Sequence, residues 1–303
     1  MSTRRSRNWS IASVLDANPT RDPLDAARRF ATLSERDDAS ISVAGRSRFF
    51  TTGARSERAV VLLHGLTNCP EQWVAFALDL HARGATVVIP RLPGHGHADR
   101  LGRTLARVRA AQTLSTVNDA IDIACGTSDR VILCGLSIGS ALATRISFER
   151  DDLTRNVVLV PFFGMRGFPY VADRVLATAL RAFPSVFVPW DPKGDGGEVP
   201  PYAYPCFPTR ALGEMLGVGG EVVRLSRRRA PSCETVLALN AREPAIDNTL
   251  AHTVVARFEA TRPGATRTLV WSDLPANHDI IDPTNARARV DLVYPRVRAE
   301  IER

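Results

Sequence analysis

Apolar runs that alternate with helical segments constrain the fold of this chain more than any other feature. Runs such as "AVVLLHG" lack the polar alternation of a half-exposed strand and are typical of strands buried on both faces. They lie at 59–65, 85–94, 130–135, 156–163, 234–240 and 267–272. Helical spacing occurs over 71–84, 104–126, 138–150, 248–260 and the last twenty residues. This order predicts an α/β fold with right-handed crossovers and a mostly parallel sheet flanked by helices.

The domain organisation predicted from this pattern is one core with two additions. Residues 1–25 are predicted to be a polar N-terminal arm or a short helix, and 26–163 together with 232–303 to be the α/β core. The stretch "ISVAGRSRFFTTG" at 41–53 alternates and ends at a glycine, which predicts an antiparallel hairpin at an edge of the sheet. The second addition is 164–231, an inserted cap or lid.

The cap is predicted from its length and composition. Some seventy residues without a convincing buried strand are too many for an ordinary connection between core strands. Within it, 183–210 is rich in proline and glycine, and prolines prevent long helices. Its aromatic side chains favour a packed lid with an apolar substrate pocket over a disordered insertion. These aromatics are Phe183, Phe187, Trp190, Tyr202, Tyr204 and Phe207.

Composition excludes several function classes. The formal net charge is +7, but the arginines are scattered and carry no interleaved aromatics, so nucleic acid is not expected as a partner. The five cysteines form no C-x-x-C pair, which disfavours a zinc ribbon or redox motif and fits a reducing, cytoplasmic location. No apolar run approaches the length of a membrane span, and the short apolar stretch near the N-terminus does not fit a signal peptide.

The segment "CGLSIGS" at 134–140 carries the clearest chemical signal. A strand, then Gly135-Leu136-Ser137-Ile138-Gly139, then a helix matches the G-x-S-x-G nucleophile elbow. Gly135 and Gly139 lack a Cβ, so strand and helix can approach each other closely. Ser137 is then expected above the carboxyl end of the sheet, where the N–H of Ile138 faces the same space and favours negative charge.

A serine nucleophile needs a base, and the base needs a carboxylate that orients it. The expected chain order is serine, acid, histidine. His278 follows the strand at 267–272 and is the predicted base. The acid is expected after 234–240, where Glu243 is favoured. Asp247 is the alternative, although an aspartate there is also an ordinary helix cap.

A second oxyanion donor is expected from the loop "LLHGLTNCPEQW" after the strand at 59–65. Gly65 permits a turn there, and the backbone N–H of Leu66 is predicted to face the serine. His64 precedes the candidate nucleophile by some seventy residues, so it is interpreted as a structural residue and not as the base.

The segment "HGHADR" at 95–100 raises a metal-dependent alternative. H-x-H-x-D begins some metallo-hydrolase sites, in which adjacent ligands hold zinc. That interpretation needs a histidine in place of Arg100 and further histidines downstream, yet none occurs between 98 and 251. No metal site is therefore predicted.

Five segments in order resemble the serine α/β-hydrolases, especially the capped carboxylesterase and monoglyceride-lipase branch. They are "HGLTNCPEQW", "PRLPGHGHADR", "CGLSIGS", "AREPAIDN" and "NHDIIDP", and the resemblance covers roughly 57–160 and 232–282. It implies an α/β-hydrolase fold with Ser137 as nucleophile and His278 as base. The family's acid is usually the aspartate of a D-x-x-V pattern, and here E-P-A-I stands in its place, so that role falls to Glu243. The cap shows no motif that the resemblance covers.

Together these features predict a serine hydrolase that cleaves carboxylic esters through an acyl-enzyme. The expected substrates are small molecules, either esters of short to medium acyl chains or monoacylglycerols. No cofactor is implied. An acyltransferase, a carbon–carbon bond hydrolase or a ligand receptor without catalytic activity would use the same fold and remains an alternative. The sequence does not predict the oligomeric state.

Overall fold

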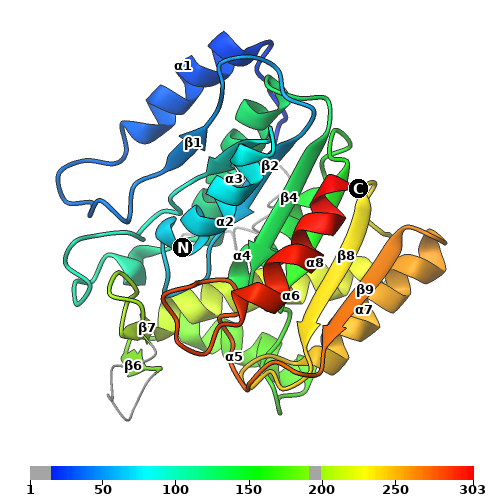
Figure 1. Ribbon diagram of the computed structural model, residues 1–303. Helices are drawn as coiled ribbons and strands as arrows, with labels where there is room; N and C mark the ends of the chain where they lie inside the picture. The colour runs from blue at the N-terminus through cyan, green and yellow to red at the C-terminus, as the bar shows by residue number, and fades with distance from the viewer. Residues whose placement is uncertain (1–14, 191–198) are drawn as a thin grey trace, which may run out of the picture.

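The computed structural model describes residues 15–190 and 199–303 and is built around one seven-stranded sheet (Figure 1). The strand order is β1-β3-β2-β4-β5-β8-β9, and every neighbouring pair is parallel except β1 with β3. The strands are β1 (Arg48–Phe50), β2 (Ala59–Leu63), β3 (Thr86–Ile89), β4 (Val131–Leu136), β5 (Arg155–Leu159), β8 (Glu234–Asn240) and β9 (Thr266–Trp271). The prediction of a mostly parallel sheet is confirmed.

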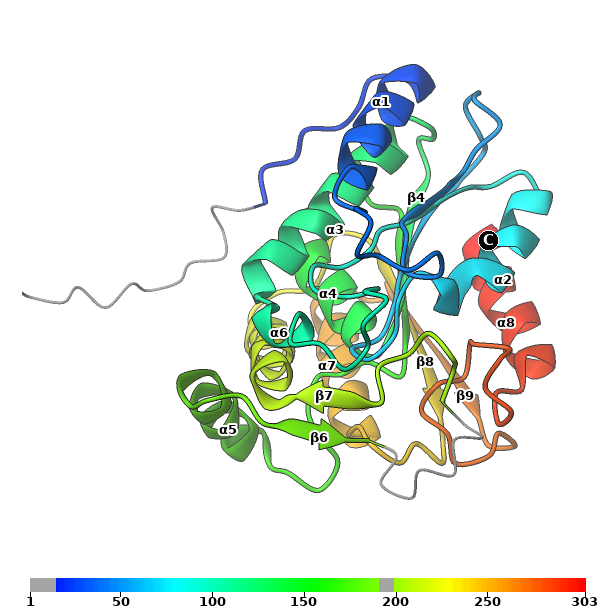
Figure 2. The same cartoon turned by 90° about the vertical axis from the view of Figure 1, so that its left-hand side faces the viewer.

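Helices cover both faces of this sheet, as Figure 2 shows from the side. Helices α3, α4, α6 and α7 lie on one face, and α2 and α8 on the other, while α1 packs against α3. The helices are α1 (Pro23–Ser34), α2 (Glu71–Ala82), α3 (Ala110–Cys125), α4 (Ile138–Ser147), α5 (Tyr170–Ala182), α6 (Thr209–Ser226), α7 (Asn248–Thr261) and α8 (Val290–Glu302), with a 3₁₀ turn η2 (Leu105–Arg107). Every residue of β2, β3, β4 and β5 is buried, as their continuous apolar sequences require.

The predicted edge hairpin at 41–53 is wrong. Only β1 forms a strand there, and it pairs antiparallel with β3. The preceding residues instead join the loop after β3, because Ile41 bridges His97 and Ser42 N–H donates to the Gly96 carbonyl at 2.9 Å. A Cβ on Gly45 would collide with the backbone of Gly96, so this close approach depends on glycine.

The helix predicted over 104–126 is interrupted. The chain forms η2, becomes extended at Arg109 with φ −131° and ψ 132°, and restarts as α3. The Glu214 carboxylate of α6 accepts a hydrogen bond from the Ala110 N–H at 3.0 Å, so a distant helix supplies the cap of α3. The helix predicted over 138–150 ends earlier, at Ser147.

The segment predicted as a cap, 164–231, has two structurally different parts. Helix α6 buries a long face and packs against α4 and α7, so it completes the helical layer over the sheet. Helix α5 and a small antiparallel pair, β6 (Phe187–Pro189) with β7 (Cys206–Pro208), lie outside that layer (Figure 2). They lie at the end of the molecule toward which β8 and β9 point (Figure 1). Part of the predicted stretch, 191–198, lies outside the described residues.

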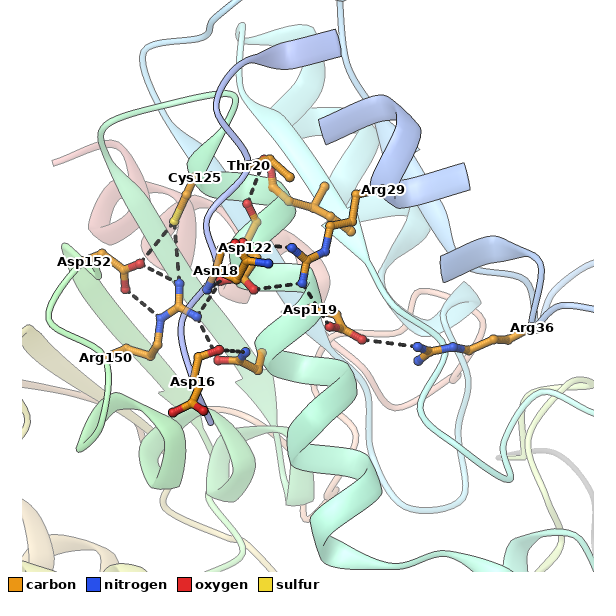
Figure 3. Close-up of polar contacts among 12 residues, drawn as sticks. Asp16, Asn18, Thr20, Arg29, Arg36, Asp119, Asp122, Cys125, Arg150 and Asp152 are labelled. Carbon is orange, nitrogen blue, oxygen red and sulfur yellow. Dashed lines mark hydrogen bonds and ion pairs between the residues drawn. The ribbon is translucent and has the colours of Figure 1, made fainter. Parts of the chain in front are cut away.

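The described part of the predicted N-terminal arm is joined to the core by polar contacts (Figure 3). Leu15 is buried, and the Thr20 N–H and hydroxyl both donate to the carbonyl of Asp122 in α3, at 3.0 and 2.8 Å. The Arg29 guanidinium of α1 pairs with the Asp122 carboxylate at 3.1 Å. From Leu15 onward the arm is therefore held against α3. Residues 1–14 lie outside the described residues.

Candidate functional site

Ser137 occupies the sharp turn between β4 and α4. Its φ of 58° and ψ of −116° lie in a region that costs a non-glycine residue on the order of 1–3 kcal/mol. Two backbone hydrogen bonds hold this conformation. The Ser137 N–H donates to the Leu159 carbonyl at 3.0 Å, and the Ser137 carbonyl accepts from the Phe162 N–H at 3.1 Å. The neighbouring strand β5 and the loop after it thus keep the serine in a strained conformation at the tip of the turn.

The two glycines of the motif are needed for close packing. A Cβ on Gly135 would collide with the backbone of Gly139, and a Cβ on Gly139 would collide with the backbone of Leu63 in β2. Helix α4 therefore starts directly against two strands. The N–H of Ile138, the first residue of that helix, donates no hydrogen bond to any described residue, so it is available to an anion.

Glu243 and His278 come together from the ends of two adjacent strands. Glu243 follows β8 by three residues, and His278 lies in the loop after β9. The His278 ring Nδ1 lies 2.9 Å from Glu243 Oε1. That oxygen also accepts the N–H groups of Ala245 and Ile246, at 2.8 and 3.3 Å. The carboxylate is thus fixed by its own turn and in turn fixes the imidazole.

Asp247, the alternative acid, has a different position. Its carboxylate accepts the Leu250 N–H at 3.1 Å and forms the N-terminal cap of α7. It makes no hydrogen bond with His278, whereas Glu243 does. Within the described chain, neither Ser137 Oγ nor His278 Nε2 has a hydrogen-bond partner. The structure thus brings the candidate acid Glu243 and the candidate base His278 together and leaves Ser137 Oγ and His278 Nε2 without a partner among the described residues.

Asn240, the last residue of β8, organises both loops and was not anticipated from the sequence. Its Nδ2 donates to the carbonyls of Pro275 and Asn277, each at 2.9 Å, and its Oδ1 accepts the Arg242 N–H at 2.9 Å. One buried amide therefore ties the turn that carries Glu243 to the loop that carries His278. The only sequence signal is a polar residue at the end of an apolar strand.

The loop after β2 presents the N–H of Leu66 without a hydrogen-bond partner among the described residues. The carbonyl of Gly65 belongs to the same peptide group. It accepts the Asn68 N–H at 3.3 Å and lies 3.0 Å from His64 Nδ1. Because the peptide is trans, the Leu66 N–H points away from that carbonyl. The loop is thus arranged to offer this N–H to an outside acceptor.

Two buried histidines hold this loop. His64 Nε2 accepts the Leu92 N–H at 3.2 Å, so the ring proton lies on Nδ1 and is donated to Gly65. Burial lowers the pKa of His64 well below its usual value, and the imidazole is neutral. His95 Nε2 lies 2.8 Å from the Leu66 carbonyl, and burial lowers the pKa of His95 to about 4. Both rings act as neutral supports for the backbone around Leu66.

The electrostatics of His278 differ from those of the two supporting histidines. Burial lowers the pKa of its imidazole, but the charge of Glu243, its hydrogen bond and the charge of Asp279 outweigh burial and raise the pKa above the usual value. A raised pKa makes the imidazole a better proton acceptor at Nε2. Nδ1 is engaged by Glu243, so the arrangement can accept a proton at one nitrogen while the other stays oriented.

Comparison with known families identifies the fold. The model of the alpha/beta hydrolase family matches residues 60–297, which is most of the chain. This chain belongs to the alpha/beta hydrolase family. The match spans the turn at Ser137, the loop at Leu66 and the loops that carry Glu243 and His278. The α/β-hydrolase fold expected from the resemblance is thereby confirmed.

Solved structures similar to this alpha/beta hydrolase share its fold at low sequence identity. One, from work on LipS and LipT, two metagenome-derived lipolytic enzymes, has a TM-score of 0.68 at 18% identity and covers 86% of this chain and 99% of that chain. A soluble variant of monoglyceride lipase from Saccharomyces cerevisiae has a TM-score of 0.67 at 11% identity, with 85% and 90% covered. A monoacylglycerol lipase from Paleococcus ferrophilus has a TM-score of 0.63 at 16% identity, with 84% and 96% covered. No curated protein matches the sequence.

The aromatics predicted to line a pocket in this hydrolase have several different environments. Tyr204 is buried, with its N–H donating to the Thr67 carbonyl at 2.7 Å and its ring edge-on to His95. Tyr202 donates to the Asp282 carboxylate at 2.5 Å. Phe183, by contrast, is 67% exposed. The expectation of one shared lining is therefore wrong for Phe183 and for Tyr204, since the first faces solvent and the second packs among core loops.

Two further findings concern metals and membranes. Within 15–190 and 199–303, no group of three or more His, Cys, Asp or Glu side chains is arranged to hold a metal ion. In the same residues, no helix has both the length and the apolar character needed to cross a membrane. Of the histidines in "HGHADR", His95 supports the Leu66 carbonyl and His97 Nδ1 lies 3.2 Å from the Ser40 hydroxyl.

Proposed function

We propose that this protein is a serine hydrolase that cleaves carboxylic esters through an acyl-enzyme. The observation that carries the proposal is the hydrogen bond between His278 Nδ1 and Glu243 Oε1, formed at the same edge of the sheet as the strained turn at Ser137. An oriented base beside an elbow serine is the arrangement that activates a hydroxyl for acyl transfer.

The proposed reaction begins when Ser137 Oγ attacks the ester carbonyl and His278 Nε2 accepts the hydroxyl proton. Glu243 keeps the proton of Nδ1 in place and stabilises the imidazolium. The N–H groups of Leu66 and Ile138 hold the oxyanion. The tetrahedral intermediate then releases the alcohol, which takes the proton from Nε2, and leaves the acyl group on Ser137. Water, deprotonated by His278, hydrolyses that ester and regenerates the serine.

The substrate class we propose is esters of short to medium acyl chains, monoacylglycerols included. Support comes from the similar structures, which include lipolytic enzymes and monoglyceride lipases, at identities that establish only the fold. The strands β6 and β7, at the carboxyl end of the sheet, carry the half-buried Phe187 and Phe207 on opposite faces of the pair, so one of the two can offer apolar surface to an acyl chain. Each methylene of the acyl chain buried there should stabilise the bound transition state by about 0.8 kcal/mol. This would raise kcat/KM about fourfold per carbon until the pocket is full.

The test combines labelling with turnover. An organophosphonate ester should modify Ser137, as identified by peptide mass spectrometry, and Ser137→Ala should lose labelling together with at least about four orders of magnitude in kcat on p-nitrophenyl butyrate. Ser40→Ala, at an exposed serine, is the control and should retain both. Turnover by the Ser137→Ala protein at near parental rate would overturn the proposal. Substrate binding without any turnover by the parent protein would favour a receptor.

A further inference from the structure

The side chain of Gln72 joins the loop after β2 that carries Gly65 and Leu66, here called the oxyanion loop, to the loop that carries His278. Gln72 lies in the first turn of α2 and is 1% exposed. Its Oε1 accepts the N–H of Gly65 at 2.9 Å, and its Nε2 donates to Asp279 Oδ2 at 2.7 Å. Asp279 is the residue directly after His278. One amide thus spans two loops more than two hundred residues apart in sequence.

Asp279 is a half-buried carboxylate with no arginine or lysine partner among the described residues. Its Oδ2 also accepts Asn68 Nδ2 at 3.1 Å, and its Oδ1 accepts the N–H groups of Ile281 and Asp282, both at 3.2 Å. In each of these hydrogen bonds an Asp279 oxygen is therefore the acceptor and an N–H group is the donor. These contacts keep both oxygens in place and hold the residue next to His278.

The chemistry of these groups allows only one orientation of the Gln72 amide. An ionised carboxylate can only accept, so the NH₂ group must face Asp279, and the amide oxygen is then left for the Gly65 N–H. The reversed amide would set two acceptors against each other at Asp279 and two donors against each other at Gly65. The clash at Gly65 would be buried, where an unsatisfied polar group costs about 1–3 kcal/mol, and the clash at Asp279 would be half-buried.

We propose that Gln72 and Asp279 are positioning residues that set the oxyanion loop relative to His278. The inference rests on the proposed function, because it assigns the Leu66 N–H to the oxyanion. Gln72 holds the N–H of Gly65, His64 holds the Gly65 carbonyl, and His95 contacts the Leu66 carbonyl, so the peptide that carries the Leu66 N–H is held together with the peptides on both sides. Because Asp279 accepts from Gln72 and directly follows His278, the same side chain also fixes the position of the base. Oxyanion donor and base then move as one unit.

The test exchanges the two groups. Gln72→Glu leaves an acceptor for Gly65 but sets two carboxylates face to face, and Asp279→Asn sets two amides face to face. In the double variant the new amide at position 279 donates to the new carboxylate at position 72, whose other oxygen accepts the Gly65 N–H, while Asn68 Nδ2 loses its acceptor at position 279. Each single variant should lose about 10- to 100-fold in kcat on p-nitrophenyl butyrate, somewhat less than complete loss of an oxyanion donor. The double variant should recover to within about fivefold of the parent, a coupling that only interacting residues show.

Two further variants guard against a loss that merely reflects poor folding. Gln72→Met keeps the buried volume, removes both hydrogen bonds and should lose kcat to the same extent as Gln72→Glu. Asn68→Ala removes another amide from the same Asp279 oxygen but does not touch the Gly65 N–H, and should lose no more than about threefold. Melting temperatures of all variants separate stability from rate.

A readout that a structural role would not move is inhibition by a trifluoromethyl ketone. Its adduct with Ser137 carries an oxyanion, so its inhibition constant should weaken by the same factor as kcat/KM, while KM for the neutral ester changes less than about threefold. Parental kcat in Gln72→Glu and Gln72→Met, or a double variant no better than the worse single one, would overturn this inference alone. Turnover that survives in Ser137→Ala would instead overturn the proposed function.

Discussion

Two polar clusters lie at opposite ends of the sheet and differ in how their charges are paired. At the end where α3 and α4 finish, the fully buried Arg150 contacts Asp122 at 2.7 Å and Asp152 at 2.5 Å (Figure 3). Arg29 of α1 adds a second cation to Asp122. Cys125 donates to Asp152, and Asn118 accepts from Arg150. Asp122 and Asp152 therefore each have a permanent positive partner.

The cluster around His278 has no such cation. Within the described chain, neither Glu243 nor Asp279 pairs with an arginine or lysine, and Glu243 Oε2 is buried without a hydrogen-bond partner. The Arg166 guanidinium contacts Glu243 only at its backbone carbonyl, at 2.8 Å, so among the described residues the group that can pair its charge with the Glu243 carboxylate is the imidazole of His278. In the first cluster the carboxylates are paired with a positive charge in the resting protein. In the second, the Glu243 carboxylate gains a positive partner only when His278 accepts a proton. We infer that the first holds the N-terminal segment and the second favours a reaction step.

The strongest predicted effect comes from breaking the pairing of Glu243 with His278. Glu243→Gln should lower kcat by about three to four orders of magnitude, because the imidazole loses its oriented tautomer and its counter-charge. Asp247→Asn is the matched control, since it changes a carboxylate four residues away that caps α7, and kcat should stay within about threefold. Steady-state kinetics on p-nitrophenyl butyrate measure both. The opposite ranking of the two variants would transfer the role of the acid to Asp247.

The next effect concerns the complete cluster. Arg150→Met should lower the free energy of unfolding by about 3–5 kcal/mol, because Asp122 keeps a buried charge with one cation fewer. Under conditions where the variant is folded, kcat should equal that of the parent. Arg130→Met, which breaks an ion pair with the exposed Glu57, should cost less than about 1 kcal/mol. Urea denaturation measures stability, and a selective loss of kcat in Arg150→Met would show that the two clusters are not independent.

The weakest predicted effect is the pH dependence of stability. Burial and the neighbouring charge of Asp282 raise the pKa of Asp279 to about 6, against the hydrogen bonds of Gln72 and two backbone N–H groups. A pKa raised in the folded state means that stability falls as pH rises from the unfolded value of 3.8 to about 6, by up to about 3 kcal/mol. Asp279→Asn should remove this fall. The pH dependence from Asp152 has the opposite sign. Burial raises the pKa of its carboxyl, but the hydrogen bond and charge of Arg150 outweigh burial and lower that pKa. The contribution of Asp152 to the free energy of unfolding is therefore lost as pH falls.

Unfolding free energies of parent and Asp279→Asn at about pH 4.5 and about pH 7 decide this prediction. Titration of His278 has little influence on that comparison, because its raised pKa acts mainly above its unfolded value of 6.5. An equal fall in both proteins would mean that Asp279 is not the group that titrates.

Local sequence rules were sufficient to predict the sheet and the short list of candidate residues, while the family was predicted from the resemblance of five segments. Continuous apolar runs are buried in the same way in any fold that contains them, and the turn between β4 and α4 needs glycines at fixed local spacing, so both are readable from a few neighbouring residues. The elbow at Ser137, the loop at Leu66 and the histidine after the last strand follow from such local rules.

The three-dimensional fold was needed to establish which carboxylate contacts His278, where the edge strand ends, and how the loops are joined. Glu243 and Asp247 are four residues apart and both suit the turn, so only the path of β9 and its loop distinguishes them. The break before α3 depends on Glu214, and the orientation of Gln72 depends on Asp279, residues distant in sequence. Hydrogen bonds between remote side chains leave no periodic pattern, because their partners meet only after the sheet has formed.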